Sequence, residues 1–384
     1  MPLDIPYSNA ILVPGCLTFG SSFRLMVDFG ENSEEAAVAA VDDLVSRAEH
    51  AGASDVHLQM RGEEAQVAFR LDGLMAQTGE LPAAVAGRMF GRIKYLARLK
   101  TYQDSLPQDG RIAKEDIGTT QDVRVATYPT VTGEKIVLRF FSEEVQGLGE
   151  LGYAPGAYEA LERFLGSTSG LMLLTGPAGS GKTTTIYSCL RHLAEQGGRH
   201  IITVEDPVEQ VLPGIMQTEV NEARGLTFAK AARHLMRQDP QVLVIGEIRD
   251  EETANIAVRA ALTGHQVIST LHAGSCSGVL ERLLVMCPDK YAVVASLALV
   301  FNQRLVRQLC ERCSGKGCED CLDTGYNNRL PITEWALMDE SIRAKVHEGG
   351  AAAFHPIDSL VVAGNKLLAD KLTDQHELGR VLGS

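Results

Sequence analysis

The sequence predicts an α/β protein, in which a small mixed domain is followed by a larger domain built on a parallel sheet. Short apolar runs alternate with helical stretches between residues 171 and 270, which is typical of a parallel sheet flanked by helices. A glycine-rich octapeptide, residues 176–183, lies between one of these runs and a helical stretch. Glycine and proline recur across residues 142–156 and predict a boundary between the two domains.

The front part of the chain predicts an arm and a first domain. Residues 1–33 mix proline, glycine and serine with short apolar pieces, and we expect an N-terminal arm there. The N-terminal domain is expected at 34–142. Its helices are predicted at 34–50, where apolar residues recur at helical spacing, and at 82–99. The runs with strand character are residues 55–60, 65–71, 122–127 and 135–141.

The rest of the chain predicts a linker, the larger domain and a C-terminal part. The strands of the larger domain are expected at residues 171–175, 200–204, 242–245 and 266–270. Because parallel strands open their carboxyl ends on one edge, polar residues that follow them should meet there. The expected segments are a linker at 143–156, the larger domain at 157–305, a tetracysteine element at 306–330 and a helical C-terminal subdomain at 331–384.

Composition limits the class of protein. The chain has 384 residues, of which 45% are hydrophobic and 22% charged, so it can fold around a sizeable core. The formal net charge is -13, and residues 1–80 alone carry 4 Lys/Arg and 13 Asp/Glu. The net charge argues against a main role in binding nucleic-acid phosphates, which normally requires a basic face. The sequence contains neither a long apolar run nor the basic start of a signal peptide, so we expect a cytoplasmic location.

The octapeptide GPAGSGKT fits the phosphate-loop pattern G-x-x-x-x-G-K-[ST] without deviation. Glycines let successive backbone N–H groups turn toward phosphate oxygens, and the following helix adds a favourable dipole. Lys182 should reach the β- and γ-phosphates, and Thr183 should hold Mg²⁺. ATP and Mg²⁺ are therefore the expected cofactors. The residues expected to bind them are Gly176, Pro177, Ala178, Gly179, Ser180, Gly181, Lys182, Thr183 and Thr184.

Carboxylates follow two of the predicted strands. An ordinary phosphate-loop enzyme has an aspartate at the end of the strand that supports Mg²⁺, but Gly246 occupies that place here and Glu247 comes next. Glu247 can orient or deprotonate an attacking water. Glu205 and Asp206 end the strand at 200–204. Each acid alone is equally consistent with a strand-end turn, whereas three acids at one sheet edge favour a site.

Two Cys-x-x-Cys pairs lie near the C-terminus and predict structural zinc. Only four residues separate the pairs, and an iron–sulfur ferredoxin run has a different spacing. A nucleic-acid-binding zinc protein stays open as an alternative because cations surround the cysteines, at Arg304, Arg307, Arg312, Lys316 and Arg329. We interpret Cys16, Cys189, Cys276 and Cys287 as ordinary thiols. The expected zinc ligands are Cys310, Cys313, Cys318 and Cys321.

Several sequence blocks carry a family resemblance. After the phosphate loop come ITVEDPVE at 202–209, RQDP at 237–240 with GEIRD at 246–250, and GH at 264–265 with STLH at 269–272. They resemble the aspartate box, Walker B region and histidine box of the type II secretion and type IV pilus assembly ATPases. Upstream blocks that match the same family are GASDVH at 52–57, LDG at 71–73, LPQDGR at 106–111, DVRV at 122–125 and TGEK at 132–135.

The resemblance spans residues 34–384 and implies a fold and an assembly. It implies a hexameric ring whose subunits pair a PAS-like N-terminal domain with a RecA-like ATPase domain. ATP would lie between the two domains, with Arg111 and Arg124 on its phosphates and Arg139 as a weaker third candidate. His272 would sense the γ-phosphate or bridge to Glu247. His265 lies at the start of the predicted strand 266–270, which His272 follows, and we interpret His265 as structural.

The implied function is mechanical work on pilin or pseudopilin subunits through an inner-membrane platform protein. The motor would be peripheral at the inner membrane through its partners, with no stable nucleic-acid binding. A DNA-uptake pilus motor, a type IV secretion-like motor and a weakly hydrolysing ring subunit stay open. Ala178 and residues 273–275 depart from the family pattern. With about 33 residues before the first helix, we expect a compact variant without a further N-terminal docking domain.

Overall fold

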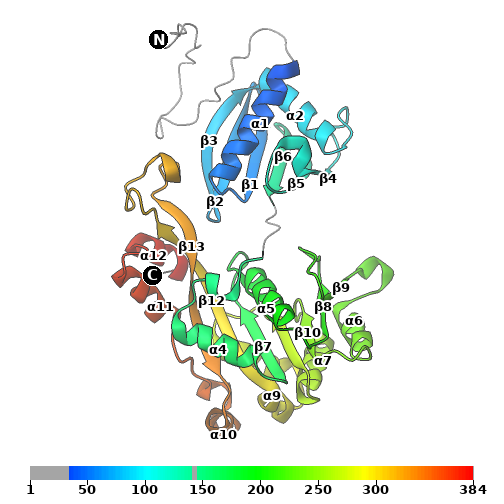
Figure 1. Ribbon diagram of the computed structural model, residues 1–384, viewed down its shortest axis with the longest axis vertical. Coiled ribbons are helices and arrows are strands. Elements are labelled where there is room, and N and C mark those ends of the chain that lie inside the picture. Colours follow the sequence, from blue (N-terminus) through cyan, green and yellow to red (C-terminus); the bar gives the residue numbers. More distant parts are fainter. Residues whose placement is uncertain (1–33, 141–144, 384) are drawn as a thin grey trace. The chain divides into compact units, whose positions relative to one another are not determined.

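The computed structural model describes residues 34–140 and 145–383 (Figure 1). The expected arm at 1–33, Cys16 and the start of the expected linker lie outside these residues. The described residues form two compact units. The first contains residues 34–140 and Cys310–Asn327, and the second contains residues 145–309 and 328–383.

The first unit is an antiparallel sheet with helices on one face. The strands run in the order β3-β2-β1-β6-β5-β4. Alternate residues such as Val56 and Leu58 are fully buried against α1 and α2, while Asp55 and His57 point to the other face. The elements are α1 (Glu34–His50), β1 (Asp55–Arg61), β2 (Glu64–Leu71), β3 (Leu74–Pro82), α2 (Ala83–Leu96), β4 (Gln108–Ile112), α3 (Lys114–Ile117), β5 (Val123–Thr130) and β6 (Gly133–Phe140).

The second unit is built on a seven-stranded sheet in the order β13-β12-β7-β11-β10-β8-β9. From β12 to β9, each strand runs parallel to the next strand in this order, so the carboxyl ends of these strands share one edge. The strands are β7 (Gly170–Thr175), β8 (Ile201–Glu205), β9 (Met216–Glu219), β10 (Val242–Ile245), β11 (Gln266–Thr270), β12 (Leu297–Leu309) and β13 (Tyr326–Leu337).

Both faces of this sheet are covered, which explains why its central strands are continuous apolar runs. Met172 and Leu174 of β7 pack with α4 and α5, whereas Leu171 and Leu173 pack with α6 to α9. The single tryptophan, Trp335 of β13, is buried against the start of α4. The helices are α4 (Pro155–Leu165), α5 (Lys182–Gln196), α6 (Phe228–Leu235), α7 (Glu251–Leu262), α8 (Cys276–Met286) and α9 (Lys290–Ser296).

The C-terminal part differs from the expected helical subdomain at its start. Residues 331–337 complete β13, and the helices α10 (Glu340–Gly349), α11 (Leu360–Ala369) and α12 (Gln375–Leu382) follow. The fully buried Glu377 fixes α12 to β12, because its carboxylate accepts a hydrogen bond from Arg307 of β12 at 3.0 Å. Arg380, on α12 itself, also donates to this carboxylate, at 2.8 Å. No helix among the described residues has both the length and the apolar character needed to cross a bilayer.

Candidate functional site

The phosphate loop joins the end of β7 to the start of α5. Its first glycine, Gly176, has φ +142°, and a Cβ there would lie 2.4 Å from the carbonyl oxygen of Gln303. Only glycine fits this approach, because any side chain would collide with the backbone of β12. The loop is therefore pressed onto the neighbouring strand, and α5 begins at Lys182 with its N-terminus at the loop.

The loop presents groups that fit a phosphate. Lys182 Nζ donates to the carbonyl oxygens of Gly176 and Pro177, each at 2.9 Å. Burial lowers the pKa of Lys182, and nearby Glu247 partly offsets this. The hydroxyl of Ser180 is buried and has no hydrogen-bond partner within the described part of the chain. A half-buried ammonium and an unmet hydroxyl beside a helix N-terminus are suited to an anionic ligand.

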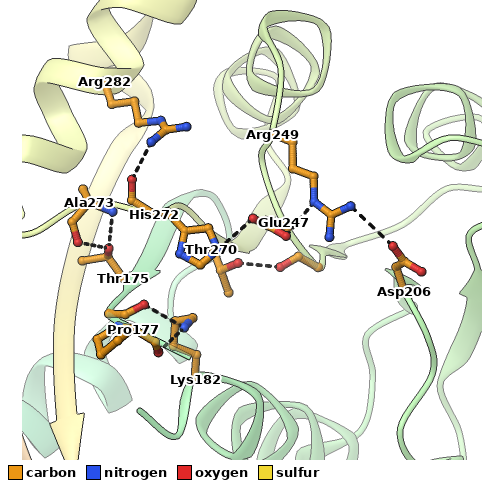
Figure 2. A network of polar contacts seen from close by, with 12 residues as sticks. Thr175, Pro177, Lys182, Asp206, Glu247, Arg249, Thr270, His272, Ala273 and Arg282 are labelled. Atoms are coloured by element: carbon orange, nitrogen blue, oxygen red, sulfur yellow. Dashed lines mark hydrogen bonds and ion pairs between the residues drawn. The ribbon is translucent and has the colours of Figure 1, made fainter. Parts of the chain in front are cut away.

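Glu247 and His272 meet at the carboxyl edge of the sheet (Figure 2). Glu247 follows β10 and His272 follows β11, and their Oε1 and Nε2 atoms are 3.0 Å apart. Two further bonds hold these strand ends together. Ile248 N donates to Thr270 O at 2.9 Å, and Thr270 Oγ1 donates to Gly246 O at 2.8 Å. The pair therefore rests on paired backbone rather than on mobile loops.

Gly246 explains why the usual aspartate is missing from the end of β10. A Cβ at this position would lie 3.1 Å from Val204 O and 3.2 Å from Cε1 of Phe228. These distances are tighter than ordinary contacts, and one of the two atoms belongs to backbone that cannot move freely. The carboxylate at this strand end therefore comes from the next residue, Glu247.

Arg249 links Glu247 to the end of β8. Its Nε donates to Glu247 Oε2 at 2.7 Å, and its Nη1 lies 3.5 Å from Asp206 Oδ2 (Figure 2). The hydrogen bond to Glu247 raises the pKa of Arg249. Sequence reasoning did not select this residue, although it lies two positions after Glu247 in the GEIRD block. The structure thus brings Asp206, Glu247 and His272 into one chain of contacts.

Glu205 lies outside this chain of contacts. Its carboxylate is buried and accepts hydrogen bonds from Tyr187 of α5, Thr203 of its own strand and, at 3.0 Å, Gln217 of β9. Burial and the hydrogen bond to Glu205 raise the pKa of Tyr187. Both oxygens of Glu205 are thus engaged by neighbouring side chains, while its neighbour Asp206 faces Arg249.

A polar cluster that the sequence did not indicate lies beneath the phosphate loop. Tyr153 donates to Gln303 Oε1 at 2.7 Å, its hydroxyl is 2.6 Å from Thr185 Oγ1, and Thr185 also donates to Gln303 at 3.1 Å. Arg304, next on β12, is near enough to help lower the pKa of Lys182. These groups come from α5, β12 and the loop before α4, and together they support the phosphate loop.

The expected arginines form a row on the first unit. Arg111, Arg124 and Arg139 lie directly opposite one another across β4, β5 and β6, and the same row continues to Asp55 on β1 and Arg70 on β2. Asp55 pairs with Arg139 at 2.7 Å and with Arg70 at 3.2 Å.

At the edge of the sheet, Arg111 pairs with Asp122. Like charges opposite each other on neighbouring strands repel. A row of guanidinium groups on one face of the sheet is therefore suited to contact an anion.

The four expected cysteines come together in the segment Cys310–Asn327. Their sulfur atoms all lie within 4.8 Å of one another, and three of the separations are 3.7 Å. A tetrahedral zinc with Zn–S bonds of about 2.3 Å requires S–S edges of about 3.8 Å. The backbone N–H groups of Cys318 and Gly325 lie 3.2 and 3.3 Å from Cys321 Sγ. The donor set thus fits a closed tetrahedral site.

Two of the five cations around this segment are paired with carboxylates. Arg307 belongs to the buried cluster with Glu377, and Arg312 pairs with Asp320. Each of these guanidinium groups already has a carboxylate partner. This weakens the alternative of a nucleic-acid-binding zinc protein, which needs positive charge available to phosphates.

Comparison with known proteins decides the family. The sequence pattern of the family described as "Type II/IV secretion system protein" matches residues 31–376. The chain belongs to this family. It is 40% identical over 345 residues to the type II secretion system protein HxcR of Pseudomonas aeruginosa, covering 85% of this chain and 73% of HxcR. It is 37% identical to the type IV pilus assembly ATPase PilB of Thermus thermophilus, over 84% of this chain but 39% of PilB.

A solved structure supports the fold of this secretion-family chain. The ATPase DotB of Legionella pneumophila matches with a TM-score of 0.70 at 20% identity, covering 88% of this chain and 94% of DotB. At that identity the likeness concerns the fold. The likeness to DotB confirms the α/β ATPase fold expected from the sequence. The family match and the two relatives confirm the resemblance to secretion and pilus ATPases.

Proposed function

We propose that this chain is the ATP-hydrolysing motor subunit of a type II secretion or type IV pilus assembly machinery. The observation that carries the proposal is the sequence of groups along one sheet edge. In strand order, the phosphate loop follows β7, His272 follows β11, Glu247 follows β10 and Asp206 follows β8. This edge offers a phosphate cradle next to a base for water, which is the arrangement that hydrolysis of a nucleoside triphosphate requires.

The phosphate loop would hold ATP and its metal. When bound, Mg²⁺ would neutralise charge on the phosphates, with Thr183 as its protein ligand. Apart from Pro177, which has no N–H, the residues from Gly176 to Thr184 would offer backbone N–H groups to the phosphates. Lys182 would exchange its two carbonyl partners for phosphate oxygens, since an ammonium binds a charged acceptor more strongly than a neutral one.

Glu247 would orient and deprotonate the attacking water. Its Oε2 is engaged by Arg249, while Oε1 lies within hydrogen-bond reach of His272. A proton taken by Oε1 would lie next to His272, which can accept or stabilise it. Glu205 and Asp206 would support this edge, Glu205 through the buried hydrogen bonds of β8 and Asp206 through Arg249.

The first unit would supply the arginines that stabilise the phosphates. The row of Arg111, Arg124 and Arg139 presents several guanidinium groups on one sheet face. Guanidinium groups lower the barrier when they meet the charge that develops during phosphoryl transfer. We propose that this PAS-like domain moves relative to the RecA-like domain during the ATP cycle, so that hydrolysis is converted into motion.

The cysteine segment would hold zinc in a structural role. Cys310, Cys313, Cys318 and Cys321 would supply all four ligands, which leaves no open position for chemistry. We further propose a homo-hexamer that acts on pilin or pseudopilin subunits through an inner-membrane platform protein. Such a motor is peripheral to the membrane and located in the cytoplasm, with no stable nucleic-acid binding.

The direct test is steady-state ATP hydrolysis by the purified full chain and its Glu247→Gln variant. We expect Glu247→Gln to lower turnover by about 100-fold or more, because the carboxamide cannot accept the proton of the attacking water. Glu251 is an exposed residue at the start of α7. The Glu251→Gln variant is the matched control and should hydrolyse ATP at the wild-type rate. Wild-type turnover no higher than that of Glu247→Gln would overturn the motor proposal and favour a weakly hydrolysing ring subunit.

A further inference from the structure

We infer that Arg249 is a positioning residue for hydrolysis, which fixes the orientation of the Glu247 carboxylate by binding it together with Asp206. The inference rests on the proposed ATPase activity and adds a residue to it. Figure 2 shows Arg249 between Glu247 and Asp206, on the side of Glu247 opposite His272. The three carboxylate and guanidinium groups come from the ends of β8 and β10, which are hydrogen-bonded neighbours.

The guanidinium of Arg249 is held from three directions. Glu247 Oε2 accepts from its Nε at 2.7 Å, and Asp206 Oδ2 lies 3.5 Å from its Nη1. The ring of Phe228 lies below it, with 5.7 Å between the guanidinium carbon and the ring centroid. Phe228 is itself buried on α6. A planar cation stacked on a fixed ring loses little freedom when it also binds carboxylates.

In this arrangement the two carboxylate oxygens of Glu247 have different contacts. Oε2 is occupied by Arg249, so Oε1 is the oxygen left to face His272 and a water molecule at the phosphate edge. Without Arg249, the carboxylate can rotate about its last torsion, which is broad for a glutamate. A base that is misplaced by about 1 Å loses up to about 100-fold in rate.

The second partner, Asp206, anchors the guanidinium of Arg249. A guanidinium that binds one carboxylate can swing with it, whereas one that spans two strand ends is anchored. Arg249 also separates two like charges, because Glu247 and Asp206 end adjacent strands and repel each other. His272 is anchored separately, since Arg282 donates to its backbone oxygen at 2.9 Å. Each member of the pair thus has its own arginine.

The experiment compares Arg249→Gln and Arg249→Lys with the wild type in steady-state ATP hydrolysis and in direct binding of a fluorescent ADP analogue. We expect Arg249→Gln to lower kcat between about 10-fold and 100-fold, with KM and the ADP dissociation constant within about twofold. This split follows because Arg249 orients the base and does not touch the nucleotide. Arg249→Lys restores the charge without the fork geometry and should recover part of the rate.

Two further variants control the result. Arg233→Gln removes another exposed arginine that pairs with a glutamate, Glu252, and should keep wild-type kcat. Asp206→Asn removes the anchor at 3.5 Å and should lower kcat less than Arg249→Gln does. If Arg249→Gln fails to fold, Arg249→Lys and Asp206→Asn carry the test, and wild-type kcat in both would overturn the inference.

The outcomes separate this inference from the proposed function. If the wild type hydrolyses ATP and a folded Arg249→Gln variant has the same kcat, the positioning role alone is overturned. A fall in ADP affinity as large as the fall in kcat also overturns it, because Arg249 would then act in binding. A wild-type chain that turns over no faster than Glu247→Gln overturns the proposed ATPase, whatever the Arg249 variants do.

Discussion

At the scale of single residues, Gly246 determines the form of the site. It stands where phosphate-loop enzymes place an aspartate, but a Cβ there would lie only 3.1 Å from Val204 O and 3.2 Å from the Phe228 ring. The same close approach brings Phe228 under Arg249. The missing side chain at one position therefore allows the contacts that orient the next carboxylate.

Substitution of this glycine should lower the stability of the fold. We expect Gly246→Ala to lower the free energy of unfolding by about 1 to 3 kcal/mol, because the methyl group forces Phe228 or β8 to shift. Urea unfolding followed by circular dichroism measures this change. Gly274→Ala is the matched control, because a Cβ there meets no atom within 4 Å; it should stay within about 0.5 kcal/mol of wild type. Equal stability of the two variants would contradict this account.

The sequence predicted the residues that carry motifs but not their partners. The phosphate loop follows from its glycine spacing, and Glu247 from its place after a buried strand. Arg249, Tyr187 and Gln303 were not selected, because their importance depends on contacts with side chains far away in the chain. Glu205 and Asp206 are adjacent in sequence, yet one is buried and the other faces Arg249, which the pattern does not distinguish.

At the scale of elements, burial decided which strands were predictable. The four expected strands of the second unit are buried on both faces and appear as apolar runs. They are β7, β8, β10 and β11. Edge strands such as β4 (Gln108–Ile112) and β9 (Met216–Glu219) are mostly polar, so they give little hydrophobic signal. Strand β13 was not expected: its residues 326–330 were assigned to the tetracysteine element and residues 331–337 to the helical C-terminal subdomain.

The attachment of α12 to β12 should depend on pH through Glu377. Burial alone would raise the pKa of Glu377, but hydrogen bonds from Arg380 and Arg307 outweigh it and lower the pKa from 4.5 to about 2. The folded state therefore stays ionised where the unfolded state binds a proton. This stabilisation, on the order of 3 kcal/mol, is present above pH 4.5 and is lost as the pH falls toward 2.

Hydrogen exchange of the α12 amides at pH 7 and pH 3 measures this effect. Glu377→Gln should increase exchange in α12 at pH 7, because two guanidinium groups lose their charged partner. Its exchange should also depend less on pH than that of the wild type, after correction for intrinsic rates. Glu348→Gln on the exposed surface of α10 is the control. Protection in Glu377→Gln equal to that in the wild type would exclude Glu377 as the attachment point.

At the scale of the whole molecule, the division into units was only partly visible in the sequence. The glycine- and proline-rich stretch marks one boundary. The segment Cys310–Asn327 groups with the first unit, although β12, which leads into it, belongs to the second. A pattern along the chain does not show that a segment groups with residues more than 150 positions earlier.

Metal content tests the cysteine segment. We expect about one zinc per chain, and Cys313→Ser should lower this number and expose residues 310–327 to proteolysis, because a structural zinc contributes about 10 to 16 kcal/mol to local folding. Binding of the ADP analogue should persist, since the phosphate loop belongs to the other unit. Cys287→Ser, which lies outside the cluster, is the control. Fresh protein with iron, or with zinc well below one per chain, would contradict the assignment.

The position of the only tryptophan has a practical consequence. Because Trp335 packs against α4 inside the second unit, its fluorescence emission reports on that unit alone. A red shift of the emission on heating or in denaturant therefore measures opening of the ATPase unit, while the first unit remains optically silent at that wavelength. A full-length chain can thus be used to ask which unit a nucleotide or a metal stabilises, without cutting the protein or attaching a dye.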